Sequence, residues 1–143
     1  MSLADRQVVG RDEELARIAA FATAPVEGPS VLLIAGDAGM GKTTLWRHGV
    51  RTLAEHGYRV LRTTPTAAER SIPLSAFTDV FADVFSEVRT DIPAPQRNAL
   101  EVALALAEPS DPTSSSEQVL GVATRSAIRA LAERGPLAIA IDD

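Results

Sequence analysis

The sequence predicts an α/β fold of three layers with a mostly parallel sheet, and three apolar stretches of the chain support this prediction. Two of them, 31–35 and 58–63, have strand character and flank a stretch of helical periodicity at 42–55. The third, 137–141, follows another helical stretch and is expected to be a buried strand. Strand, helix and strand in succession imply parallel pairing through a right-handed crossover.

The first helices are defined by the residues at their ends. Asp12 is expected to cap a helix whose apolar residues recur three and four positions apart, and Pro25 ends this helix. The helix at 42–55 is expected to close at Gly57, because a left-handed residue after a helix is usually glycine.

The second half of the chain shows three further stretches of helical spacing. Phenylalanine and valine recur within 77–85 and predict a helix packed in the core, and 96–107 continues the same layer. A last helix is expected to run to about Glu133, with Ser114 and Glu117 as its capping box.

Composition fits one globular domain over residues 1–143, with 45% hydrophobic and 23% charged residues. The net charge of -5 disfavours a nucleic-acid-binding surface, so we expect DNA contact only through a region outside this chain. The chain has no cysteine, which excludes disulfides and thiolate metal sites. No apolar run approaches the ~20 residues of a membrane helix, and we expect a cytoplasmic protein without a membrane partner.

Residues 36–43 read Gly-Asp-Ala-Gly-Met-Gly-Lys-Thr, which is the G-x-x-x-x-G-K-[ST] pattern of a P-loop. Glycines let main-chain N–H groups approach a phosphate closely, and the following helix start adds partial positive charge. The alternative is a glycine-rich turn with a solvated lysine. We predict phosphate binding by Gly36, Asp37, Ala38, Gly39, Met40, Gly41, Lys42, Thr43 and Thr44.

Acidic residues follow the last apolar stretch, as in a Walker B motif. We predict that Asp142, together with the hydroxyl of Thr43, holds Mg²⁺, because this ion prefers hard oxygen ligands. Asp143 is the candidate general base that polarises the attacking water, and Lys42 supplies charge toward the β and γ phosphates.

Residues 9–15 resemble the V-G-R-x-x-E-L box that opens AAA+-like and STAND-type ATPase modules. Residues 69–77 and 93–100 and the terminal acidic pair are similar to the ATPase module of large LuxR-type transcriptional regulators. This resemblance implies a P-loop NTPase fold with adenine as the base, and it places Val9, Gly10 and Arg11 beside that base.

The resemblance also implies a switch that binds ATP or ADP with Mg²⁺, hydrolyses ATP slowly, and associates with itself or with protein partners. Members of that family continue with further strands, a sensor residue and a helical lid, so we expect a domain truncated after the Walker B strand. Hydrolysis is then expected from the full-length protein and binding from this part. Two alternatives remain open, a small-molecule kinase and a non-catalytic interaction module that holds nucleotide.

Overall fold

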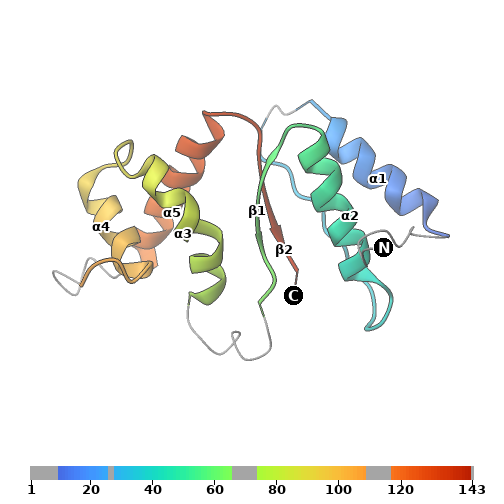
Figure 1. The fold of residues 1–143 in the computed structure, drawn as a ribbon, viewed down its shortest axis with the longest axis horizontal. Helices are drawn as coiled ribbons and strands as arrows, with labels where there is room; N and C mark the ends of the chain where they lie inside the picture. The colour runs from blue at the N-terminus through green and yellow to red at the C-terminus, as the bar shows by residue number, and fades with distance from the viewer. Residues whose placement is uncertain (1–9, 26–27, 66–73, 109–116, 143) are drawn as a thin grey trace. The chain divides into compact units, whose positions relative to one another are not determined.

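The computed structural model describes residues 10–25, 28–65, 74–108 and 117–142 (Figure 1). The chain divides into two compact units, residues 1–60 and 61–143. The division falls inside strand β1 (Arg59–Thr63), which continues directly from the first unit into the second.

The first unit contains two helices that pack against each other, α1 (Asp12–Thr23) and α2 (Lys42–Glu55) (Figure 1). Their contact is close at Gly49, where an added Cβ would lie 3.7 Å from Cγ2 of Ile18. The bounds predicted for α2 are confirmed. Asp12, however, does not cap α1 but is its first helical residue, a position where the helix dipole favours an acidic side chain.

The prediction of a strand at 31–35 is wrong. Among the described residues the sheet consists of β1 and β2 alone, and 31–35 has no strand assignment. Val31 and Leu33 are 89% and 82% exposed. An apolar β-branched run forms a strand only where a neighbouring strand takes up its main-chain hydrogen bonds, and no described segment does so here.

The second unit combines three helices with strand β2. The helices are α3 (Ser75–Val88), α4 (Ala94–Ala103) and α5 (Glu117–Ala132), and α5 contacts both others. Strand β2 (Leu137–Ile141) pairs with β1 in parallel, as Figure 1 shows. The predicted parallel pairing is therefore confirmed for these two strands, and the molecule has the α/β class.

The core of the second unit lies between the helices and one face of this small sheet. Val88 and Leu100 are fully buried, and the rings of Phe77 and Phe81 lie 4.7 Å apart between centroids. Strand β2 is less buried than predicted, since Ile141 is 63% exposed. A two-stranded sheet covers few of its own side chains, which explains this difference. Further members of the core are Leu61, Val80, Phe81, Val84, Phe85, Ile92, Ala99, Leu104, Ala123, Ala127, Ala130 and Leu131.

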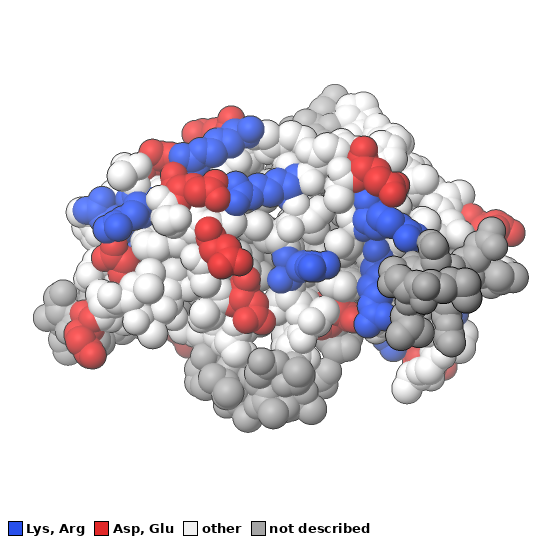
Figure 2. Space-filling view, in the orientation of Figure 1, with Lys and Arg blue, Asp and Glu red and all other residues white. Residues whose placement is uncertain are grey.

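Acidic and basic side chains are interspersed on the face shown in Figure 2. In the second unit, two ion pairs involve the residues that follow α3: Asp91 pairs with Arg134 after α5 at 2.8 Å, and Arg89 pairs with Glu101 of α4 at 3.3 Å. No helix in the described part of the chain is long and apolar enough to cross a membrane.

Two helices end in the same hydrogen-bonded turn with different residues at its left-handed position. After α2, the N–H groups of Gly57 and Tyr58 donate to carbonyls in the last helical turn, and Gly57 has φ +83° as predicted. After α4, Ala105 takes the equivalent place with φ +56°. This turn ends α4 earlier than the predicted bound of 107. The predicted capping residue Ser114 lies outside the described residues.

Replacing Ala105 with glycine is expected to stabilise the second unit by about 0.5–1 kcal/mol. The left-handed conformation costs an L-residue about 1–2 kcal/mol, and glycine avoids this cost. Glycine loses more conformational entropy on folding than alanine, which offsets part of the gain in stability. The matched control is Ala82→Gly at an exposed position inside α3, which is expected to destabilise by about 1 kcal/mol. Urea denaturation of both variants gives the comparison, and a loss of stability in both would contradict the strain at Ala105.

Candidate functional site

The loop before α2 has a backbone that requires glycine at two positions. Gly39 has φ +80°, and Gly41, the residue that caps α2, has φ +75° and ψ +26°. Residues with a side chain rarely adopt these backbone angles, because their Cβ then crowds the following carbonyl at a cost of about 1–2 kcal/mol. The motif therefore has glycine at positions 39 and 41 because the backbone of this loop is left-handed there.

The main chain of this loop leaves hydrogen-bond donors unused. Within the described residues, the N–H groups of Ala38, Gly39 and Gly41 donate to no acceptor, whereas that of Met40 donates to the carbonyl of Asp37 at 3.3 Å. The free donors stand at the N-terminal end of α2, where the helix dipole adds partial positive charge. Such a group of donors suits an anion.

Lys42 brings a full positive charge to the same loop. Its Nζ donates to the carbonyl oxygens of Gly36 at 3.0 Å and Asp37 at 3.2 Å. The side chain therefore folds back from the first turn of α2 over the loop. Thr43 and Thr44 follow it in this turn, and the N–H of Thr44 donates to the carbonyl of Gly41 at 3.1 Å.

An arginine at the N-cap position of α1 contacts this loop from 29 residues away in the sequence. Nη2 of Arg11 donates to the carbonyl oxygen of Met40, and Nη1 lies 3.8 Å from Oε1 of Glu14. Gly10 precedes it with φ +76°. The structure thus brings Arg11 together with the P-loop, while Val9 lies outside the described residues.

In the second unit, Asp142 directly follows β2 at the carboxyl end of the sheet. Its N–H donates to the carbonyl of Thr63 at 3.1 Å, and Thr63 Oγ1 donates to Oδ2 of Asp79 at 3.0 Å. Thr63 and Asp79 belong to no sequence motif of this chain. The available signal is that Thr63 ends the neighbouring strand, where α/β sheets hold their ligands. Asp143 lies outside the described residues.

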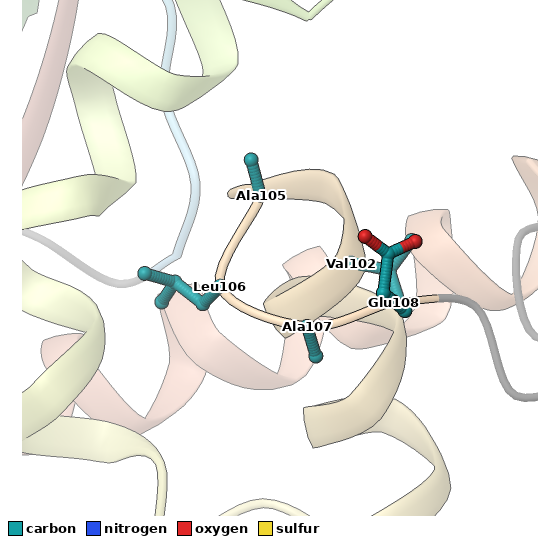
Figure 3. A pocket seen from close by; sticks show the side chains of 5 residues that line it. All are labelled: Val102, Ala105, Leu106, Ala107 and Glu108. Carbon is teal, nitrogen blue, oxygen red and sulfur yellow. The ribbon is translucent and has the colours of Figure 1, made fainter.

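The hollows in the described surface offer no better site. One of about 530 Å³ lies at the turn after α4, where Leu106, Ala107 and Glu108 wrap the helix end (Figure 3). Glu108 is its only charged lining residue, whereas ligand sites usually combine apolar walls with several converging polar groups.

A second hollow, of about 430 Å³, lies at the start of α1 and is lined by three carboxylates, a glycine and Arg17. This charge is unfavourable for a phosphate. No group of three or more potential metal ligands among His, Cys, Asp and Glu occurs in the described residues.

Comparison with known protein families gives a match over nearly the whole chain. The matching family is described as an AAA ATPase domain, and the match covers residues 7–143. No curated protein and no solved structure matches the chain.

Proposed function

The chain belongs to the AAA ATPase domain family, and on this premise we propose that it binds ATP with Mg²⁺ and hydrolyses it slowly. We further propose that nucleotide occupancy acts as a switch in a signalling or transcriptional regulator. The resemblance of residues 69–77 and 93–100 to the ATPase module of large LuxR-type regulators supports this regulatory role.

The observation that carries the nucleotide proposal is the arrangement of donors in the P-loop. Three N–H groups that have no acceptor among the described residues, those of Ala38, Gly39 and Gly41, share one loop with the ammonium of Lys42. An added Cβ at Gly39 would meet no atom within 4 Å, so the space beside the main chain is open there. The donors present therefore fit a polyphosphate. In the proposed complex the loop holds the phosphates, and Arg11 contacts the loop through the carbonyl of Met40.

Mg²⁺, when bound, would neutralise charge on the β and γ phosphates. Thr43 is the proposed hydroxyl ligand of this ion, and Asp142 is the proposed carboxylate ligand. Asp143 would orient and deprotonate a water molecule as general base. ATP and ADP are the proposed alternating ligands, protein partners or a second copy of the chain would respond to them, and DNA would be bound outside this chain.

A pair of glycine variants at the two ends of α2 tests the proposal. Gly41 and Gly57 have similar left-handed angles, φ +75° and +83°, so alanine strains the backbone about equally at either position. Gly41→Ala is expected to weaken Mg-ATP binding about tenfold or more, since 1–2 kcal/mol of strain falls on the phosphate loop. Gly57→Ala is expected to leave affinity unchanged.

Isothermal titration calorimetry of the two variants and the unaltered chain measures this difference. Equal affinities for all three would contradict binding at the P-loop.

A further inference from the structure

We infer that Arg11 is a positioning residue that fixes the direction of a phosphate-binding N–H group by holding the P-loop from behind. The inference rests on the proposed function of the loop and concerns how the loop keeps its shape. It predicts that Arg11 supports the binding of any polyphosphate, whatever base is attached.

The contact lies on the Met40–Gly41 peptide, and both Gly41 and the residue before Met40, Gly39, have left-handed backbone angles. Nη2 of Arg11 donates to the carbonyl of Met40, and an added Cβ on Gly41 would lie 3.9 Å from the same nitrogen. The guanidinium therefore lies directly against the turn formed by Gly39, Met40 and Gly41.

Holding this carbonyl determines where the next N–H points. The described chain contains no cis peptide bond, and in a trans peptide the carbonyl of one residue and the N–H of the next point in opposite directions. With the Met40 carbonyl turned to Arg11, the N–H of Gly41 is turned away from Arg11, and within the described part of the chain it donates to no acceptor. Glycine has little conformational preference, so without this contact the peptide can rotate at small cost.

Lys42 holds the other side of the loop in the same manner. Its contact with the carbonyl of Asp37 restrains the peptide whose N–H belongs to Ala38, and its contact with the carbonyl of Gly36 restrains the peptide before it. Arg11 and Lys42 thus restrain different peptides of one loop. Glu14, whose Oε1 lies 3.8 Å from Nη1 of Arg11, restrains the guanidinium in turn.

The test compares three ligands that share phosphates and differ in the base: Mg-ATP, Mg-GTP and inorganic tripolyphosphate with Mg²⁺. Arg11→Ala is expected to weaken binding of each ligand by the same factor, about tenfold, because a charge-assisted hydrogen bond that orders the loop is lost. The matched control is Arg17→Ala, which removes the same charge from an exposed position of α1. It is expected to change none of the three affinities by more than about twofold.

Calorimetric titrations distinguish the outcomes. Weaker binding of ATP with unchanged binding of tripolyphosphate would overturn the inference, because Arg11 would then act on the base. Unchanged binding of all three ligands would also overturn it. An equal loss in Arg17→Ala would do the same, because the effect would then be one of net charge.

A second variant and a separate control keep the inference distinct from the proposed function. Arg11→Lys retains the charge without the planar fork, and we expect a smaller loss that is again equal for the three ligands; this variant serves if Arg11→Ala unfolds. Lys42→Ala tests the function itself. If it abolishes tripolyphosphate binding while the Arg11 variants bind normally, the function stands and the inference fails. If the unaltered chain binds no tripolyphosphate, both fail.

Discussion

Lys42→Ala is expected to weaken Mg-ATP binding about a hundredfold, because hydrogen bonds from a charged donor are worth about 1.5–3 kcal/mol each. The variant also frees the carbonyls of Gly36 and Asp37, to which Nζ now donates. The loop would therefore lose the restraint on these two carbonyls as well as the positive charge that attracts the phosphates. Isothermal titration calorimetry measures the change.

Arg47→Ala provides the control for this variant. It removes one positive charge from an exposed position of α2, one turn after the loop, and is expected to retain affinity within about twofold. A loss of similar size in both variants would contradict a specific role of Lys42, since net charge alone would then explain the effect.

Leu100→Ala is expected to destabilise the second unit by about 2–5 kcal/mol, since a buried leucine loses both its transfer free energy and the packing around the cavity. Leu100 is 0% exposed and belongs to the core in which α4 packs against α5. A loss of this size is comparable to the whole stability of a small domain. Urea denaturation followed by circular dichroism gives the change in the free energy of unfolding.

Leu106→Ala is the matched control on the same segment. Leu106 is 64% exposed, so we expect a change of no more than about 0.5 kcal/mol. If the two alanine variants unfold at the same urea concentration, the core of the second unit does not depend on the α4–α5 contact.

Local sequence signals predicted the elements whose cause is local. The bounds of α2 follow from a left-handed glycine at each end, Gly41 and Gly57, and the bounds of β2 from an apolar run between a glycine turn and an acid. Segment 31–35 has an equally strong apolar run and still forms no strand, because a strand depends on a partner elsewhere in the chain. Helix α4 ends early because Ala105 adopts a left-handed conformation, which alanine disfavours. No sequence pattern therefore predicted this helix end.

In the candidate site, too, the features that depend on neighbouring residues were predicted and those that depend on distant residues were not. The P-loop motif predicted where glycines and a lysine converge, since these residues lie within a few positions of one another. The contact of Arg11 with the Met40 carbonyl joins residues 29 positions apart and depends on how α1 packs on α2. Likewise, Thr63 meets Asp79 only because β1 and α3 fold together. Such contacts come from tertiary packing, which a single sequence does not encode in a readable pattern.

Lys42 is the only lysine of the sequence, which allows a direct measurement of the central claim that the P-loop holds a polyphosphate against its ammonium. Amine acetylation followed by mass spectrometry reports the reactivity of its Nζ, with the amino terminus as internal reference. We predict that saturating Mg-ATP or tripolyphosphate slows acetylation of Lys42 and leaves the amino terminus unaffected. Acetylation of Lys42 at the same rate with and without these ligands would contradict the claim.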